Sequence, residues 1–214
     1  MQPLRIVCVS SCLIGLAATP LAQAEEGEFQ LGLGTPFLGY SSYTEDPDNG
    51  EESSISGLTW GIGHEVFAEL GYGITPSLVL GGLVQLGGTS MTSETGDNEV
   101  DSGSFELLLG PKLDFVLMPG DKVQPFVGGV IGYVNSSTST EFENVETSTS
   151  TSGFMFMARG GVRIFPGKEF SIDPWLGLGY FTGGVEYEGE DNSVENDLSG
   201  FELMVHLTVS GWMD

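Results

Sequence analysis

The chain has few basic residues: six Lys or Arg stand against 30 Asp or Glu in 214 residues, and the formal net charge is −24. This balance excludes nucleic-acid binding, because a phosphate backbone is held by clustered cations. An apolar fraction of 40% is nevertheless too high for a disordered acidic chain. The 33 glycines follow no collagen-like repeat and disfavour long helices.

Cysteine is almost absent, since Cys8 and Cys12 are the two cysteines of the chain. Both precede an A-x-A cleavage motif at residues 22–24, at the end of a short apolar run of the kind found in export signals. We expect residues 1–24 to be a cleaved signal peptide. The mature protein, residues 25–214, is then a single exported domain without a disulfide.

After this leader, no apolar run reaches the roughly 18 residues that a transmembrane helix needs. Apolar and polar residues alternate instead, as in Phe201–Val209, where every odd position is apolar. A period of two is typical of β-strands with one apolar face. Eight such segments are predicted, at about 28–40, 58–74, 77–90, 103–117, 123–135, 153–165, 170–186 and 198–212.

The connections between these segments alternate between two kinds. Three are short turns with Pro or Gly, and four are longer polar loops, at about 41–57, 91–102, 136–152 and 187–197. The loops are acidic and contain no Lys or Arg. Strict alternation places all long loops at one end of an up-and-down meander.

Aromatic residues gather near the predicted strand ends. The set at the long-loop end is Tyr40, Tyr43, Trp60, Phe105, Tyr133, Phe154, Tyr187 and Phe201. The set at the other end is Tyr72, Phe115, Phe165, Phe170, Trp175 and Trp212. Two aromatic belts beside an apolar band are typical of a protein that meets two lipid–water boundaries.

These features resemble the small eight-stranded outer-membrane β-barrels of the OmpA and OmpX type, over the whole of residues 25–214. The resemblance implies an all-β, eight-stranded antiparallel up-and-down transmembrane β-barrel in the outer membrane, with short turns in the periplasm. It also implies a monomer in contact with outer-membrane lipids and the β-barrel assembly machinery, with no cofactor and no nucleic acid.

Some residues do not fit a regular barrel. Pro36, Pro111 and Pro174 lie inside predicted strands, where each removes a backbone donor, so we expect bulges or interrupted pairing there. Barrels of this kind usually end in an outward aromatic residue. Trp212 is out of phase with Phe201–Val209, and we expect a bulge near Ser210-Gly211 to restore its phase.

The inward face of the predicted strands is charged. A barrel of eight strands is just wide enough for side chains to fill it. We therefore expect a structural network of ion pairs, in which each base meets more than one carboxylate; an ion path is the alternative. The candidate residues are Glu65, Glu69, Glu106, Lys112, Asp114, Arg159, Arg163, Glu202 and His206, with Asp173 on the same face.

Catalysis is the second hypothesis, because some small outer-membrane barrels modify lipids through a histidine. The sequence has His64 and His206, but neither has a serine at a persuasive spacing on the same face, so we predict no enzyme. A third hypothesis is a soluble exported barrel with an apolar ligand inside. It is disfavoured because the polar face carries too much glycine and too little charge to face water.

The acidic loops suggest weak divalent-cation sites. Residues 46–52 partly resemble a calcium loop, but the glycine comes one position too early and the final Glu is missing. The weak candidate ligands are Asp46, Asp48, Glu51, Glu190 and Asp191. The sequence thus predicts a structural or surface-interaction protein with a closed lumen and acidic extracellular loops.

Overall fold

The computed structural model describes residues 27–47, 53–60, 65–95, 98–142, 145–167, 169–189 and 193–213. These residues form nine β-strands: β1 (Phe29–Asp46), β2 (Ser53–Trp60), β3 (Glu65–Thr75), β4 (Leu78–Thr95), β5 (Asn98–Val116), β6 (Val123–Phe142), β7 (Val145–Ile164), β8 (Phe170–Glu188) and β9 (Ser193–Met213). Within these ranges no helix has the length and apolarity needed to cross a bilayer. The predicted signal peptide, residues 1–24, lies outside the described residues.

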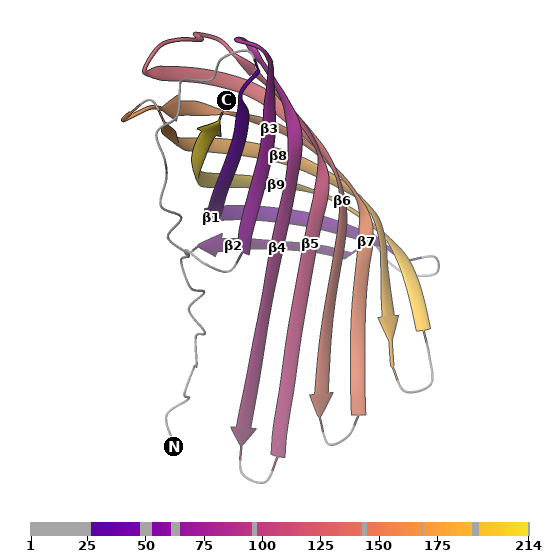
Figure 1. Cartoon of the computed structure of the whole chain (residues 1–214). Helices are drawn as coiled ribbons and strands as arrows, with labels where there is room; N and C mark the ends of the chain where they lie inside the picture. Colours follow the sequence, from indigo (N-terminus) through magenta and orange to yellow (C-terminus); the bar gives the residue numbers. More distant parts are fainter. Residues whose placement is uncertain are drawn as a thin grey trace.

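Eight strands close into an antiparallel ring (Figure 1). Its order is β1-β3-β4-β5-β6-β7-β8-β9, and β9 pairs back with β1 from Phe29↔Met213 to Asp46↔Asp197. Beyond β3, β1 pairs with β2 instead, from Leu38↔Trp60 to Glu45↔Ser53. The predicted eight-stranded up-and-down barrel is confirmed, with one predicted strand, 58–74, divided into β2 and β3.

The strands are longer than the sequence predicts. β4 and β5 stay paired out to Thr95↔Asn98, and β6 and β7 out to Phe142↔Val145. Figure 1 shows these two long hairpins at the lower end of the molecule, which we call the hairpin end; the opposite end, with the turns before β4, β6 and β8, is the short-turn end.

The prediction of four long polar loops is therefore wrong over most of their length. The segments are rich in Ser and Thr. Strands made of these residues are polar on both faces, so they lack the alternation of apolar and polar residues by which strands are predicted. They nevertheless pair in register, and the Ser148 hydroxyl donates to Glu188 Oε2 at 3.1 Å across β7 and β8.

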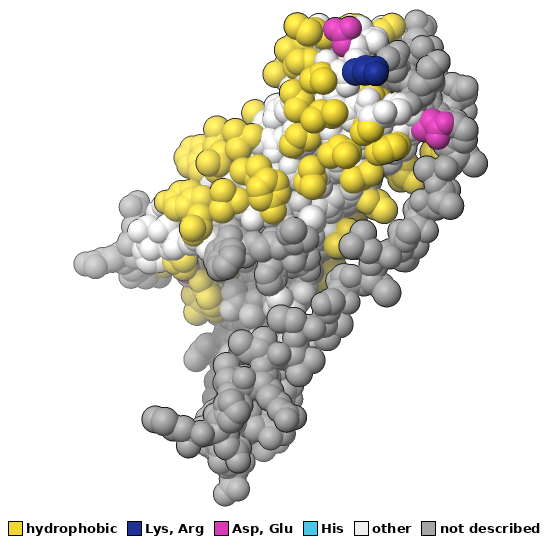
Figure 2. All heavy atoms as spheres, turned by 90° about the vertical axis from the view of Figure 1, so that its left-hand side faces the viewer, with side chains coloured by type: hydrophobic (Ala, Val, Ile, Leu, Met, Phe, Trp, Pro, Cys, Tyr) yellow, Lys and Arg dark blue, Asp and Glu magenta, His cyan; other side chains and the backbone are white. Residues whose placement is uncertain are grey.

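The outer surface of the ring is apolar, as Figure 2 shows for one face. Leu70 is 61% exposed and Leu109 is 53% exposed, whereas their neighbours Glu69 and Leu108 are buried. This alternation confirms that the apolar face points outward and the charged face inward. Such a wall is stable where hydrocarbon, not water, surrounds it.

Aromatic side chains lie on this surface towards both ends. Near the hairpin end, Tyr133 and Phe154 have ring centroids 5.9 Å apart, and Tyr180 and Phe201 have centroids 5.1 Å apart. Near the short-turn end, Phe29 and Tyr72 make a similar contact at 5.0 Å. Four residues predicted for these belts instead pack inside the ring: Tyr43, Phe165, Trp175 and Trp212. The side chain of Trp60 is not among those that the structure describes.

The prolines behave as the sequence predicts, but the chain end does not. The β1–β9 register shifts between Pro36 and Leu38, and the β5–β6 ladder is interrupted between Leu109 and Lys112, beside Pro111. The β7–β8 ladder is interrupted at Pro174 in the same way. The predicted bulge near Ser210-Gly211 is wrong: pairing with β1 continues in register, so Trp212 stays on the inward phase.

Candidate functional site

The interior of the ring is filled in layers. Nearest the short-turn end is an apolar layer of Val79, Val116, Phe165 and Trp212. A layer of charged residues follows it. Towards the hairpin end lies a larger apolar cluster, made of Phe67, Leu83, Leu108, Phe126, Val130, Val134, Met155, Met157, Trp175, Phe181 and Met204. Five strands, β3, β5, β7, β8 and β9, supply ionisable side chains to the middle layer or to the region next to it on the hairpin side, because inward positions alternate along each strand.

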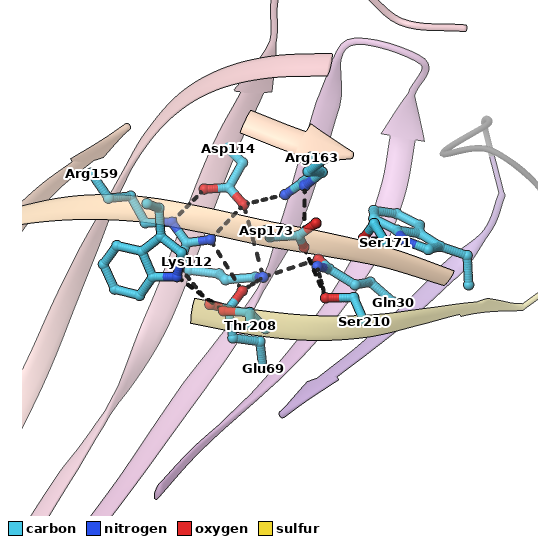
Figure 3. A network of polar contacts seen from close by, with 12 residues as sticks. Gln30, Glu69, Lys112, Asp114, Arg159, Arg163, Ser171, Asp173, Thr208 and Ser210 are labelled. Carbon is cyan, nitrogen blue, oxygen red and sulfur yellow. Dashed lines mark hydrogen bonds and ion pairs between the residues drawn. The ribbon is translucent and has the colours of Figure 1, made fainter. Parts of the chain in front are cut away.

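Glu69 of β3 lies at one pole of the charged layer (Figure 3). Arg159 binds Glu69 in a bidentate manner: Nη1 donates to Oε1 at 2.8 Å, and Nη2 donates to Oε2 at 3.1 Å. Lys112 also donates to Glu69, and it donates to Gln30 Oε1 at 3.0 Å. These four side chains come from β1, β3, β5 and β7 and so join four strands across the lumen.

Asp114 of β5 lies at the other pole. It accepts a hydrogen bond from Arg163 Nη2 at 2.7 Å, and Arg159 Nε lies 3.1 Å from its other oxygen. Lys112 Nζ lies 3.8 Å from Asp114. Arg163 Nε also lies 4.0 Å from Asp173 of β8, whose Oδ2 accepts a hydrogen bond from Ser210.

The layer balances its charges, with three bases (Lys112, Arg159 and Arg163) and three acids (Glu69, Asp114 and Asp173). All six are buried, and each base contacts two carboxylates. Buried ions persist when they are paired and hydrogen-bonded in this way. The arrangement can hold strands together across the lumen and can obstruct ion passage.

Aromatic rings cover the guanidinium groups on both sides of the layer. The Arg159 guanidinium carbon lies 4.5 Å from the Trp175 ring centroid, and that of Arg163 lies 4.8 Å from Phe126 and 5.1 Å from Trp212. Sequence reasoning missed these aromatic residues as partners of the charges. The alternation of the strands could have identified them. Trp175 is two residues from the inward Asp173 and so lies on the same face, and Trp212 is at an even position of β9, where the odd positions point outward.

Glu65, Glu106 and Glu202 lie closer to the hairpin end than the charged layer. Gln85 Nε2 donates to Glu65 Oε2 at 2.6 Å, but none of the three carboxylates makes an ion pair with a base among the described residues. The ion-paired network is thus smaller than the sequence predicts, and these three glutamates form a separate group.

His206 also lies outside the ion pairs. Its ring stacks on Trp175 with centroids 3.8 Å apart and planes 5° from parallel, and Phe67 meets it edge-on at 5.1 Å. Neither ring nitrogen has a hydrogen-bond partner within the described residues, so no serine hydroxyl is paired with it there. His64 lies outside the described residues.

Of the five weak cation ligands, Asp46 is described and exposed, while Asp48, Glu51, Glu190 and Asp191 lie outside the described residues. In the part of the chain that the structure describes, no three His, Cys, Asp or Glu side chains are grouped so that they could hold a metal ion. Near the same end, the Tyr187 hydroxyl donates to Glu45 Oε2 at 3.0 Å. Partial burial and this carboxylate raise the pKa of Tyr187.

Comparisons with known proteins agree with this geometry. The family model "Outer membrane protein beta-barrel domain" matches residues 8–206. Among solved structures, OprG of Pseudomonas aeruginosa matches with a TM-score of 0.57 and 10% identity, over 89% of this chain and 98% of that one. The outer membrane protease OmpT of Escherichia coli matches with a TM-score of 0.51 and 7% identity, over 93% and 99%.

Ail, the attachment invasion locus protein of Yersinia pestis, is 14% identical over 88% of this chain and 99% of that one, with a TM-score of 0.46. No curated protein matches the chain. At their identities, OprG and OmpT support the fold alone. The family match covers most of the sequence, and the chain therefore belongs to the outer-membrane β-barrel proteins.

Proposed function

We propose that this outer-membrane protein is a sealed, non-catalytic barrel that presents an acidic β-sheet at the cell surface. The observation that carries the proposal is the charged layer, in which six buried and balanced side chains from β3, β5, β7 and β8 span the lumen. On its short-turn side, Phe165 and Trp212 pack as a second barrier, with ring centroids 6.0 Å apart. On this proposal the protein acts as a monomer, with outer-membrane lipids and the assembly machinery as its general partners.

The surface role is inferred from the hairpin end. Carboxylates face each other directly across strands there, as Glu186 faces Glu195 and Asp46 faces Asp197. Like charges in such positions repel each other. Water and counter-ions reduce this repulsion, so a sheet that carries such pairs is more stable in water than in lipid. We infer that divalent cations of the cell surface associate weakly with this end, through the acidic residues of the hairpins.

A conductance measurement tests the sealed lumen. Purified protein in a planar bilayer should show no steady ion current, because the charged layer and the apolar layers on both sides of it fill the lumen. A steady current through the unaltered protein would overturn the proposal. For the surface role, millimolar Ca²⁺ should slow proteolysis of the hairpins, and unchanged digestion would count against cation association.

Lipid modification remains the competing function, and one observation weighs against it. His206 is enclosed by Trp175 and Phe67 and has no hydrogen-bonded nucleophile, whereas acyl transfer needs a nucleophile within reach of a base. Lipid analysis of a deletion strain distinguishes the two functions: the sealed barrel predicts an unchanged lipid profile, and an enzyme predicts loss of a modified lipid.

A further inference from the structure

One side of β2 is an open sheet edge near the hairpin end (Figure 1). All eight residues of β2, Ser53–Trp60, pair with β1, and among the described residues no strand pairs with the opposite side of β2. In an antiparallel ladder the backbone N–H and C=O groups point alternately to the two neighbouring strands. Alternate backbone groups of β2 therefore have no strand partner in the described part of the chain.

This open edge lacks the features that usually keep an exposed strand from pairing with another chain. Natural edge strands are protected by Lys, by Pro, by a bulge or by an inward charge. Ser53–Trp60 contains no charged residue and no proline, and its register with β1 is uninterrupted. The backbone of β2 can therefore serve as a template for one more strand.

Two apolar side chains of β2 are exposed on opposite faces of the sheet. Ile55 pairs with the inward Tyr43 and is 63% exposed, and Leu58 pairs with the outward Tyr40 and is 66% exposed. Directly paired residues point to the same face, so Ile55 faces inward and Leu58 faces outward. A strand added beside β2 would cover both side chains, which a contact on one face alone cannot do.

The surroundings of the open edge are acidic. Ser53, at the beginning of β2, pairs with Glu45 of β1. The Glu45 carboxylate accepts hydrogen bonds from Tyr187 and Asn196, but it makes no ion pair with a base among the described residues. Residues 41–57 contain no Lys or Arg at all. A strand that carries bases is therefore favoured here, because charges of opposite sign steer two surfaces together and fix their register.

The register of β2 defines the sequence that an added strand needs. An antiparallel partner, which is the more stable kind, runs from the level of Leu58 towards that of Ser53. If its residue i lies opposite Leu58, residue i+3 lies opposite Ile55 and residue i+5 lies opposite Ser53. Residue i+5 is then on the same face as Glu45 and about 10 Å from it across the small serine, two strand spacings that a Lys side chain can bridge.

We propose that the open edge of β2 is a docking site for an extended basic segment of another protein, which adds to the sheet as one further antiparallel strand. Main-chain hydrogen bonds provide the attachment, and apolar residues at i and i+3 with a base at i+5 provide the selectivity. The inference rests on the proposed function, because it needs the hairpin end to lie at the cell surface, and it adds the place of contact and the kind of partner.

The first experiment titrates a synthetic peptide into a folded protein of residues 25–214 in detergent micelles. The peptide has eight residues: Leu at position 1, Val at position 4, Lys at positions 6 and 8, and Thr elsewhere. It should slow hydrogen exchange at the alternate amides of β2 that point away from β1. Unchanged exchange at these amides, with peptide bound elsewhere or not bound, would overturn the proposal.

Two further peptides test whether the backbone makes the contact. One is N-methylated at its odd positions and the other at its even positions, and both keep the same side chains. Only the peptide whose methyl groups face β2 should bind roughly tenfold more weakly, because it cannot complete the ladder. Equal binding of both methylated peptides and the unmethylated one would show general adsorption to an acidic surface and would contradict a docking strand.

The second experiment compares two variants of the protein. Ile55→Lys places a base on the open edge and should weaken binding of the peptide roughly tenfold. Val194→Lys is the matched control, because it adds the same charge at an apolar residue of β9 that is 52% exposed, and it should bind as the unaltered protein does. Equal affinity of the two folded variants would overturn the docking site.

Two other occupants of the open edge would be detected before any peptide is added. If β2 pairs with the far part of β4, its outer amides are already protected in the protein alone. If a second copy of the chain pairs with β2, this protection increases with protein concentration. Either result overturns the proposal. Conductance is measured separately, so failure of the docking site leaves the sealed lumen in place, and a conducting barrel that binds the peptide would overturn the sealed lumen alone.

Discussion

Arg159 and Arg163 each contact two buried carboxylates. Loss of both leaves Asp173 without a base and leaves Glu69 and Asp114 to share Lys112. Breaking a buried ion pair by removing one partner costs about 3–5 kcal/mol. We therefore expect Arg159→Ala/Arg163→Ala to lower the unfolding midpoint in urea and the temperature at which the folded band disappears from an unboiled gel.

The control for this variant is Lys122→Ala, which removes an exposed base from the turn between β5 and β6. It should unfold as the unaltered protein does. Arg163→Lys keeps the charge but loses the planar fork, so its stability should fall between the two. Equal stability of all these variants would refute the structural role of the charged layer.

Trp212 is fully buried, and its indole Nε1 donates to Ser171 Oγ at 3.1 Å. Trp212→Ala should destabilise the folded barrel by about 3–5 kcal/mol, as is usual for truncation of a buried Trp. Met213→Ala, at the neighbouring outward position, should change stability far less. Denaturant titration of the two variants in detergent measures the difference, and the reverse order would mean that Trp212 faces lipid.

At the residue scale, the sequence predicts which face of the wall a side chain lies on better than it predicts which residues that side chain contacts. The period of two assigns Lys112, Asp114 and Arg159 to the lumen correctly. It cannot say that Glu69 meets Arg159 while Glu65 meets no base, because that depends on how far the strands are shifted against each other around the ring.

Among the elements, β2 and the far part of β4 break the regularity of the wall. β3 pairs with β4 as far as Glu65↔Gly87. Among the described residues, β2 pairs with β1 alone, and Thr92–Thr95 of β4 pair with β5 alone. The described wall thus has unpaired strand edges only towards the hairpin end.

Hydrogen exchange should reveal this difference within one strand. Amides of β4 between Leu78 and Gly87 should be protected on both sides, because both neighbouring strands pair there. In Thr92–Thr95 the amides that point away from β5 should exchange much faster. Uniform protection along β4, measured by NMR in detergent micelles, would contradict the observed pairing.

Element lengths were the least predictable feature. Ser148–Ser152 has no apolar alternation, yet it pairs in register with both β6 and β8. Pairing of this kind depends on neighbouring strands that the ring already holds in place, which a local pattern does not contain. The bulge at Pro36 was predictable, because a proline inside a strand has no backbone donor.

For the whole molecule, closure and orientation depend on each other. Unpaired backbone groups cost several kcal/mol in hydrocarbon, so a wall that faces lipid must have no free edge. The chain satisfies this by joining β9 to β1, and its apolar side chains then cover the outside of the ring. Composition and alternation were enough to predict this architecture, because both follow from the two solvents that the wall separates.

The most direct test of the account is the environment of spin labels at single cysteines. Residues 25–214 contain no cysteine, so labels can be placed singly in a protein of these residues at Leu86, Leu109, Phe156 and Leu178 on the outer face, with Ser139 of the hairpin end as a control. In lipid bilayers, power-saturation measurements should show the four outer labels relaxed by oxygen and not by a water-soluble nickel complex, with the reverse at Ser139. Nickel-accessible labels at all five positions would mean that the apolar face does not meet lipid, and would contradict the account.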